Sequence, residues 1–405
     1  MKIPGKVMRF VTWSQEDPRA VSFIARLLHC VFGIRNGLPG RKGFLLIFTG
    51  ASGDMVSLSP AIRELARQRP DTPVSIMVKG SGTGSILKAC PYVDQIVEFC
   101  LYEDTPCKWW QLLKPLWRIV WRRRYATAVL TMGTGWAPQY RIWALLLLYA
   151  TGARRRLAFR DECAPWWNAG DPVHRLPLAN EIIEASQPQR TDRFMELFQK
   201  AGLLTEAEHA TTEVWTSEDD VREVAQLDEC FARRGDDRPI VLVFPGVGSG
   251  PGKRWPPGRY VKVVSHLIAT YNAHVFLDGM SRDHPLCKTI AALVSCKNLA
   301  GRHSIGALFA LIKLADLVIA SDSGPIHIAA ATETPAVAIF GPTDPRIWAP
   351  KSPCLTILRT SDCPPCGNPY FCQRGIDFVC TTHVAVSDVM QACQHSLRIW
   401  NPQCR

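Results

Sequence analysis

The sequence predicts an α/β protein of two halves, each built on a parallel β-sheet with helices packed against it. Short apolar runs alternate with helical segments in both halves, which is the pattern of βαβ units. A chain of 405 residues also exceeds what one ordinary hydrophobic core supports. The hydrophobic fraction of 47% and the charged fraction of 20% fit a globular protein and exclude a disordered one.

The first half begins after an extension at residues 1–40. Residues 20–35 have the pattern of a basic amphipathic helix, which either packs on the domain or contacts a membrane. Strands are predicted at 43–48, 74–78, 94–99, 125–131 and 153–159. Helices are predicted from about residue 58 to 68, from residue 80, at 140–150 and at 190–201.

The second half follows an extended linker at 211–219 and repeats the alternation. Its predicted strands lie at 240–244, 273–277, 314–320 and 336–340. We therefore expect a first Rossmann-like domain over 41–210 and a second over 211–385. Residues 386–405 are predicted to form a C-terminal helix that returns toward the first domain.

Charge and cysteine usage narrow the partners and the compartment. The net charge of +11 favours nucleotide phosphates, nucleic acid or an anionic membrane surface. No apolar run approaches the roughly 20 residues of a spanning helix, and the N-terminus lacks the features of a signal peptide. These features predict a cytoplasmic protein with reduced thiols, and the odd count of 15 cysteines argues against a disulfide framework.

The most informative stretch is the run from 321 to 345, which reads as strand, polar turn, helix and strand. It places Asp322, Ser323, Gly324 and His327 together at the carboxyl end of a parallel strand, where ligands bind in such folds. A helix N-terminus that offers free N–H groups binds phosphate. Taken alone, the pattern fits an ordinary βαβ crossover equally well.

A glycine-rich loop, PGVGSGPGKRWP, follows the strand at 240–244. Gly246, Gly248 and two further glycines let backbone N–H groups approach a phosphate, and Lys253 or Arg254 can neutralise it. The G-K-[ST] ending of a Walker loop is missing. The alternative is a flexible loop with a solvated basic pair.

Asp54 lies in the turn GASGDM after the first strand. A carboxylate there can act as a general base on a hydroxyl, or it can cap the following helix. The local pattern favours the cap.

Four cysteines close together predict a metal site. Their number within a short span suits tetrahedral zinc or iron with a structural role, and free thiols or one disulfide are equally compatible. The candidate ligands are Cys363, Cys366, Cys372 and Cys380.

Arginines in two clusters are interleaved with tryptophan and tyrosine. This pattern suits a membrane interface or a phosphorylated glycolipid, and otherwise forms a solvated face. The candidate acceptor-binding residues are Arg122, Arg123, Arg124, Arg154 and Arg156.

Taken together, the motifs resemble those of glycosyltransferase family 9, the ADP-heptose:lipopolysaccharide heptosyltransferases. GDMVSLSPAIRELARQRPDTPVSIMV resembles the family's N-terminal element, PGVGSGPGKRWP its donor loop, and SDSGPIHIAAATETPAVAIFGPTDP its D-[ST]-G-x3-H element followed by G-P-T-[DS]-P. The resemblance covers the chain from Gly43 to about Cys393.

The resemblance implies a GT-B architecture, with two Rossmann-like domains facing across a cleft, and an inverting transfer that needs no metal. Asp54 would be the general base, Lys253 would contact the donor phosphates, and Asp283 would hold the ribose. Asp322, Ser323, Gly324 and His327 would line the diphosphate and sugar. The implied donor is ADP-heptose and the acceptor a lipopolysaccharide core at the inner membrane.

Two features depart from the family pattern. The extension at 1–40 is unusual, and the donor loop has glycines where many members carry Thr or Ser, which leaves other sugars and nucleotides open. A protein hydroxyl is an alternative acceptor. A basic nucleic-acid-binding or metal-binding protein is the alternative class, although no nucleic-acid-binding motif is present.

Overall fold

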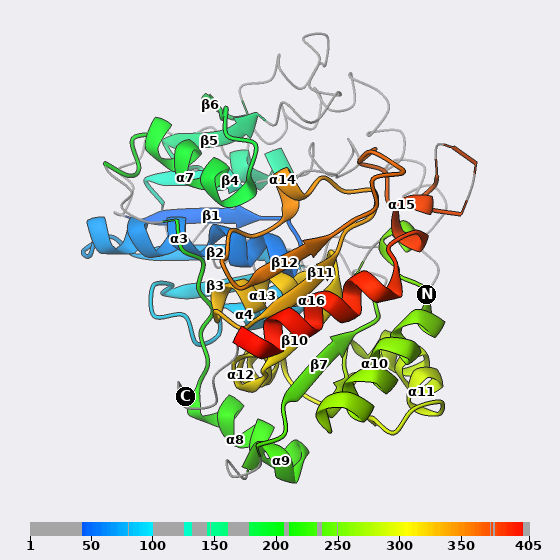
Figure 1. The fold of residues 1–405 in the computed structure, drawn as a ribbon. Coiled ribbons are helices and arrows are strands. Elements are labelled where there is room, and N and C mark those ends of the chain that lie inside the picture. The colour runs from blue at the N-terminus through cyan, green and yellow to red at the C-terminus, as the bar shows by residue number, and fades with distance from the viewer. Residues whose placement is uncertain are drawn as a thin grey trace, which may run out of the picture. The chain divides into compact units, whose positions relative to one another are not determined.

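The computed structural model describes residues 43–79, 81–99, 125–131, 144–145, 147–160, 178–205, 210–232, 237–248, 250–372, 374–375 and 377–399. They form two compact units (Figure 1). The first unit holds the described residues up to Ala210, except Val56–Ser59 and Pro188–Asp192, which group with the second unit. The second unit contains Thr211 onward. The domain bounds expected from the sequence, and the return of the C-terminal helix toward the first domain, stay predictions.

The first unit is built on a six-stranded parallel sheet with the order β3-β2-β1-β4-β5-β6. Strand β1 pairs with both β2 and β4, and all five of its residues are buried. An apolar run covered on both faces is typical of a central parallel strand. The strands are β1 (Phe44–Phe48), β2 (Val74–Lys79), β3 (Gln95–Phe99), β4 (Thr127–Thr131), β5 (Arg155–Arg160) and β6 (Glu181–Glu184).

Helices of the first unit include α3 (Ser52–Gln68), α4 (Ser81–Ile86) and α7 (Arg190–Lys200). Residues 144–145 and 147–150 are also helical, and Leu145, Leu148 and Tyr149 pack in the core with β1 and β4. The sequence predicts a buried or interfacial helix at 140–150, and the described residues of this stretch form a largely buried one.

Helix α3 begins at Ser52, six residues earlier than the sequence predicts. Asp54 explains the early start, because its Oδ2 atom accepts the N–H of the N-cap residue Ala51 at 3.0 Å, which is one of the two bonds of a capping box. Pro60 inside the helix cannot donate to the carbonyl of Val56. The hydroxyl of Ser59 donates to that carbonyl instead, at 2.7 Å, and the helix continues.

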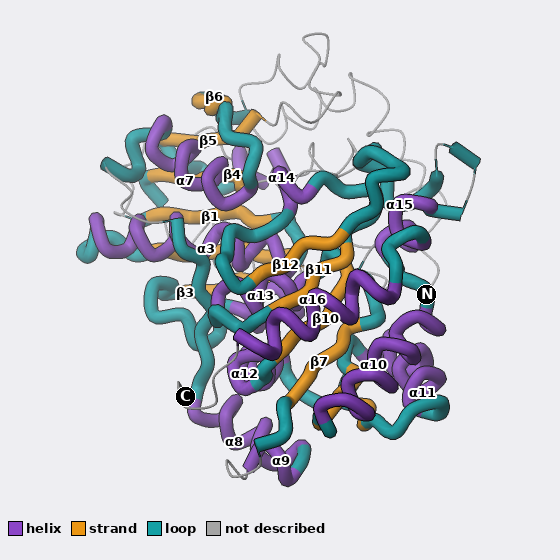
Figure 2. The backbone as a smooth tube through the Cα atoms, viewed as in Figure 1, coloured by secondary structure: helices purple, strands orange, loops and turns teal. Residues whose placement is uncertain are grey.

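The second unit repeats the same topology. Its parallel sheet has the order β12-β11-β10-β7-β8-β9, which, counted from the first strand of the unit, is the Rossmann order 3-2-1-4-5-6 found also in the first sheet. Figure 2 shows β7, β10, β11 and β12 side by side. The strands are β7 (Ile240–Phe244), β8 (His274–Leu277), β9 (Lys297–Asn298), β10 (Leu317–Ser321), β11 (Ala336–Ile339) and β12 (Leu355–Leu358).

Helices cover the second sheet. Helices α12 and α13 contact each other, and α13 packs on β10 and β11, while α16 packs on β10, β11, β12 and α10 (Figure 1). The helices are α8 (Glu218–Leu227), α9 (Glu229–Ala232), α10 (Pro257–Tyr271), α11 (His284–Ala291), α12 (Ile305–Leu314), α13 (Gly324–Ala331), α14 (Pro345–Trp348), α15 (Val379–Thr382) and α16 (Val386–Ile399), with single 3-10 turns η4 (Pro251–Lys253) and η5 (Ser281–Asp283).

The core of the second unit joins α10, α11 and α16 to one face of the sheet. Val243, Ile319 and Ile339 point into it from three strands, and Val389 and Cys393 close it from α16. Within the described residues, no helix combines the length and apolarity that crossing a membrane requires.

Candidate nucleotide-sugar site

The residues predicted to hold the donor follow the carboxyl ends of neighbouring strands in the second sheet. The glycine-rich loop follows β7, and Asp322 follows β10, which pairs directly with β7. The chain leaves these two strands in opposite directions along the sheet, so the loops after them flank the topological switch point where Rossmann folds bind ligands. The topology therefore brings the two predicted donor motifs to one place.

Lys253 and Asp322 form an ion pair at this point. The Nζ atom of Lys253 lies 2.7 Å from Oδ2 of Asp322, whose side chain is 4% exposed. The hydroxyl of Thr343, in the loop after β11, donates to the same carboxylate oxygen at 2.7 Å. The carboxylate thus holds the lysine ammonium at the end of the central strands, where an anionic ligand would meet it.

The other end of the donor loop is anchored in the core. Trp255 is fully buried, and its indole N–H donates to the carbonyl of Val384 at 3.1 Å. The ring of Tyr260 meets Trp255 edge-on at 4.9 Å, and its hydroxyl lies 3.2 Å from that of Ser321 at the end of β10. Trp255 is therefore a packing anchor for the donor loop.

Helix α13 begins directly after Asp322. Ser323 is its N-cap residue, but the Ser323 hydroxyl donates to the carbonyl of Ser321 at 3.0 Å and caps no N–H of the helix. A Cβ atom placed on Gly324 would meet nothing within 4 Å. His327 lies one turn further along and is 8% exposed. The helix start is open, which suits the approach of a phosphate.

Gly246 and Asp283 lie in contact, although the sequence separates them widely. A Cβ atom on Gly246 would collide with the carboxylate of Asp283, which also accepts the N–H of Met280 at 3.0 Å. Gly248 lies beside the guanidinium of Arg282. Asp283 is thus brought to the donor loop, and its role toward a ribose stays a prediction.

Sequence reasoning missed a buried ion pair next to this turn. Asp278 follows β8, is fully buried, and accepts bonds from the N–H of Gly279 at 2.7 Å and from Nε2 of His303 at 2.9 Å. Burial lowers the pKa of His303, but Asp278, the Ser304 carbonyl and Glu223 together outweigh burial and leave that pKa raised. The signal in the sequence was the Asp after an apolar strand, HVFLD.

Asp54 lies at the carboxyl end of β1 in the first unit, in the first turn of α3. It is half-buried, and the helix N-terminus stabilises its negative charge. Its bond to Ala51 makes it part of the cap, as the local sequence pattern favoured, though at the third helical position instead of the N-cap. The carboxylate has further lone pairs, so capping does not preclude proton transfer.

The two described arginines of the predicted acceptor site differ. Arg154 is exposed. Arg156 is buried, stacks over Tyr149 at 5.2 Å, and donates to the carbonyls of Leu178 at 3.0 Å and Ala153 at 2.8 Å. This geometry favours a structural role for Arg156. Three further predicted residues, Arg122, Arg123 and Arg124, lie outside the described residues, as does the amphipathic segment at 20–35.

The four cysteines of the predicted metal site lie near one another. Burial raises the pKa of Cys380, and the thiols of Cys363, Cys366 and Cys372 raise it further. Within the part of the chain that the structure describes, however, no three His, Cys, Asp or Glu side chains are placed to hold one metal ion. The four thiols lie near one another, but their arrangement does not fit a metal ion.

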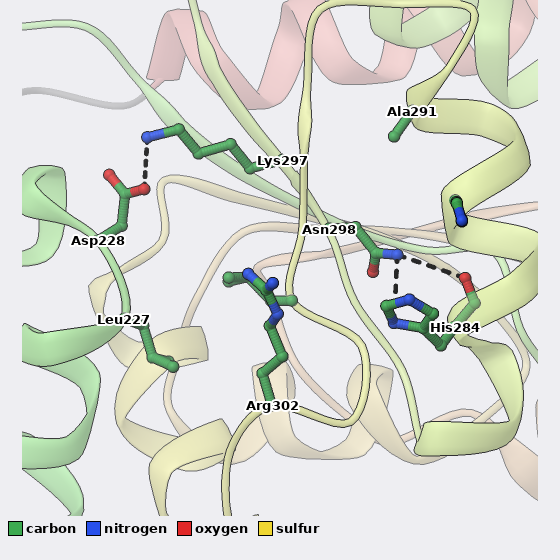
Figure 3. A pocket seen from close by; sticks show the side chains of 9 residues that line it. Leu227, Asp228, His284, Ala291, Lys297, Asn298 and Arg302 are labelled. Carbon is green, nitrogen blue, oxygen red and sulfur yellow. Dashed lines mark hydrogen bonds and ion pairs between the residues drawn. The ribbon is translucent and has the colours of Figure 1, made fainter.

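A separate pocket of about 340 Å³ lies by α11 and β9 (Figure 3). Lys297 bonds to Asp228 on one side of it, and the Asn298 amide bonds to His284 on the other. None of the residues predicted for donor, acceptor or metal binding lines this pocket.

Two sheets of Rossmann order, with a basic residue and an open helix start at the switch point of the second, define a GT-B-like protein with a candidate nucleotide-binding site. The profile described as "Glycosyltransferase family 9 (heptosyltransferase)" matches residues 142–368, more than half of the chain. The chain belongs to glycosyltransferase family 9.

Curated relatives align over part of their length. Lipooligosaccharide heptosyltransferase 2 of Haemophilus influenzae is 38% identical over 129 residues, which span 30% of this chain and 37% of that protein. Lipopolysaccharide heptosyltransferase 2 of Escherichia coli K12 is 28% identical over 195 residues, which span 46% of this chain and 56% of that protein.

Solved structures share the fold over nearly the whole chain. A family 9 glycosyltransferase from Veillonella parvula has a TM-score of 0.71 at 16% identity and covers 90% of this chain and 99% of its own. E. coli ADP-heptose lps heptosyltransferase II has a TM-score of 0.66 at 20% identity and covers 88% and 98%. An iron-containing glycosyltransferase, TibC of enterotoxigenic E. coli, has a TM-score of 0.53 at 14% identity and covers 89% and 77%.

Proposed function

We propose that the protein transfers a heptosyl residue from ADP-heptose to a lipopolysaccharide core-type acceptor, with inversion at the anomeric carbon. The observation that carries the proposal is the Lys253–Asp322 pair at the switch point of the second sheet. Family membership and the heptosyltransferase relatives support the donor and the acceptor.

In the proposed reaction, the acceptor hydroxyl attacks the anomeric carbon and loses its proton to Asp54. The bond from the anomeric carbon to the diphosphate oxygen breaks through an oxocarbenium-like state, and ADP leaves. Negative charge grows on the leaving diphosphate. Lys253 and the open N-terminus of α13 stabilise that charge more in the transition state than in the ground state.

Further assignments belong to the same proposal. Gly246 and Gly248 let the loop backbone approach the phosphates, Asp283 holds the ribose, and Ser323, Gly324 and His327 line the diphosphate and sugar. Arg154 contacts the acceptor. The tight contact between Gly246 and Asp283 supports a shared role for these two residues in binding the nucleotide.

The test is ADP release from ADP-heptose with and without truncated lipopolysaccharide. Asp54→Asn should lose turnover by about 100-fold or more, because general-base catalysis is worth that much, and should still bind ADP. Asp71→Asn, a change at an exposed carboxylate after the same helix, is the matched control and should be fully active. Full activity of Asp54→Asn would overturn the mechanism, and transfer only to protein hydroxyls would overturn the acceptor.

We also propose that the enzyme works in the cytoplasm, at the anionic face of the inner membrane. The net charge of +11 supports this placement. Co-sedimentation with vesicles that contain anionic lipid, lost at high salt, is the expected result. Equal recovery with neutral vesicles would contradict it.

A structural zinc or iron ion at the four cysteines stays a prediction that the observed arrangement does not favour. The iron-containing relative TibC is the observation in its support. Elemental analysis of purified protein decides the matter: about one metal ion per chain supports the site, and none overturns it.

A further inference from the structure

The cysteine-rich segment packs directly on the donor loop. The N–H of Gly252 donates to the carbonyl of Pro369 at 2.9 Å. The ring of Pro369 lies against Gly250, whose φ of +78° is in the region that favours glycine, and a Cβ atom there would collide with it. The segment therefore shapes a loop that lies more than a hundred residues earlier in the chain.

Phe378 and Thr381 continue the contact. The Phe378 ring lies so close to Gly252 that a Cβ atom there would collide with it, and Phe378 itself has a φ of +32°, which is strained for an aromatic residue. Thr381 is fully buried and donates from Oγ1 to the carbonyl of Gly252 at 2.5 Å. Both side chains thus fix the residue immediately before Lys253.

Thr381 also joins the donor loop to the loop after β11. A Cβ atom on Gly341 would collide with the Thr381 hydroxyl and would lie 3.1 Å from the carbonyl of Gly252. Two residues after Gly341, Thr343 bonds to Asp322, and Asp322 pairs with Lys253. The contacts form a closed ring that starts and ends at the donor loop.

We propose that Thr381 is a positioning residue for Lys253. The donor loop is rich in glycine, so its backbone is intrinsically free, and the η4 turn that carries Lys253 is only three residues long. By holding the Gly252 carbonyl, Thr381 fixes the orientation of the peptide group between Gly252 and Lys253. That orientation determines where the Lys253 ammonium lies relative to the ends of β7 and β10. This inference rests on the proposed function, in which Lys253 binds the donor diphosphate.

The test compares three variants of the full chain by ADP affinity, donor KM, kcat and Tm. Thr381→Val has nearly the same shape without the hydroxyl, and it should weaken ADP binding about tenfold, since the lost bond leaves a buried carbonyl unsatisfied. Thr381→Ser keeps the hydroxyl and should restore affinity. Thr382→Val is the matched control, because the Thr382 hydroxyl bonds to the carbonyls of Asp377 at 3.2 Å and Phe378 at 3.3 Å and not to the donor loop.

The outcomes separate the two proposals. Thr381→Val that binds ADP as tightly as the wild type and loses only Tm would overturn the positioning role alone. A wild type that does not bind ADP would overturn the proposed function and this inference with it. If Thr381→Val does not fold, Thr381→Ala removes the same hydroxyl, and unchanged ADP affinity in that variant would overturn the inference.

Discussion

Lys253 and Asp322 pair at 2.7 Å although they belong to different sequence motifs, one after β7 and one after β10. Asp322 is nearly fully buried and Lys253 is 17% exposed, so the lysine is the member of the pair that keeps access to solvent. We therefore expect the pair to affect both the stability of the fold and the binding of ADP, and the two effects can be measured separately.

We expect Lys253→Met to lower the free energy of unfolding by about 2–3 kcal/mol, because it leaves the Asp322 carboxylate buried without its cation. The double variant Lys253→Met/Asp322→Asn should recover most of this stability and still bind ADP weakly. Urea unfolding and ADP titration measure the two effects. Recovery of ADP binding in the double variant would show that Lys253 does not contact the diphosphate.

Two glycine substitutions should distinguish an effect on stability from an effect on ADP binding. Gly246→Ala places a methyl group on the carboxylate of Asp283, so we expect a loss of stability of about 1–3 kcal/mol. Gly324→Ala meets open space and should fold at least as stably as the wild type.

The same Gly324→Ala variant should bind ADP more weakly, since under the proposed function its methyl group would stand where the diphosphate approaches the start of α13. Thermal unfolding with and without ADP measures both properties. Unchanged ADP binding in stable Gly324→Ala would place the phosphates elsewhere.

The Asp278–His303 pair should make stability depend on pH. Nδ1 of His303 lies 2.9 Å from the Ser304 carbonyl and Nε2 lies 2.9 Å from Asp278, so only the doubly protonated ring donates to both. Glu223, from α8, also favours the cation. Because the folded-state pKa is raised above 6.5, the stabilisation is complete below that pH and is lost as pH rises through the folded value.

His303→Gln should remove this pH dependence while it retains one hydrogen bond. Urea unfolding of both proteins across the range from acid to mildly alkaline pH is the measurement. Parallel stability curves for His303→Gln and the wild type would contradict the predicted linkage.

We expect Arg156 to contribute to the stability of the fold and Arg154 to contribute to acceptor binding. Arg156→Lys loses the bonds to two carbonyls and the stacking on Tyr149, and we expect it to destabilise the protein by about 2 kcal/mol. Arg154→Ala should leave stability unchanged and raise the acceptor KM. A raised acceptor KM in Arg156→Lys at unchanged stability would reverse this assignment.

The parallel sheets could be predicted because β1, β7, β10 and β11 are unbroken apolar runs followed by glycine or polar turns. Local pattern also located Asp322, directly after such a run, and Lys253, at the end of the glycine-rich loop that follows another. Their pairing could not be predicted, because it depends on strand order, and strand order is a property of the whole sheet. The start of α3 was missed because glycine at position 53 resembles a loop, whereas Asp54 supplies the cap.

Burial was the second property that the sequence did not reveal. Arg156 looks like a member of a solvated basic cluster, yet its guanidinium satisfies backbone carbonyls inside the first unit. His303 looks like an isolated loop histidine, yet it pairs with an aspartate that is fully buried. Leu178 lies 22 residues from Arg156 and Asp278 lies 25 residues from His303, so the residues next to Arg156 and His303 in the sequence do not reveal these contacts.

The bond from Thr381 to Gly252 spans 129 residues, which makes it one of the most non-local contacts of the second unit. During synthesis, β7 and its loop leave the ribosome long before Phe378 and Thr381 are made. The loop can reach its final backbone geometry only after those later residues have folded onto it, because loop closure must precede the contact. Under the proposed function, the nascent chain therefore gains the ability to bind the donor only after Phe378 and Thr381 have folded onto the loop.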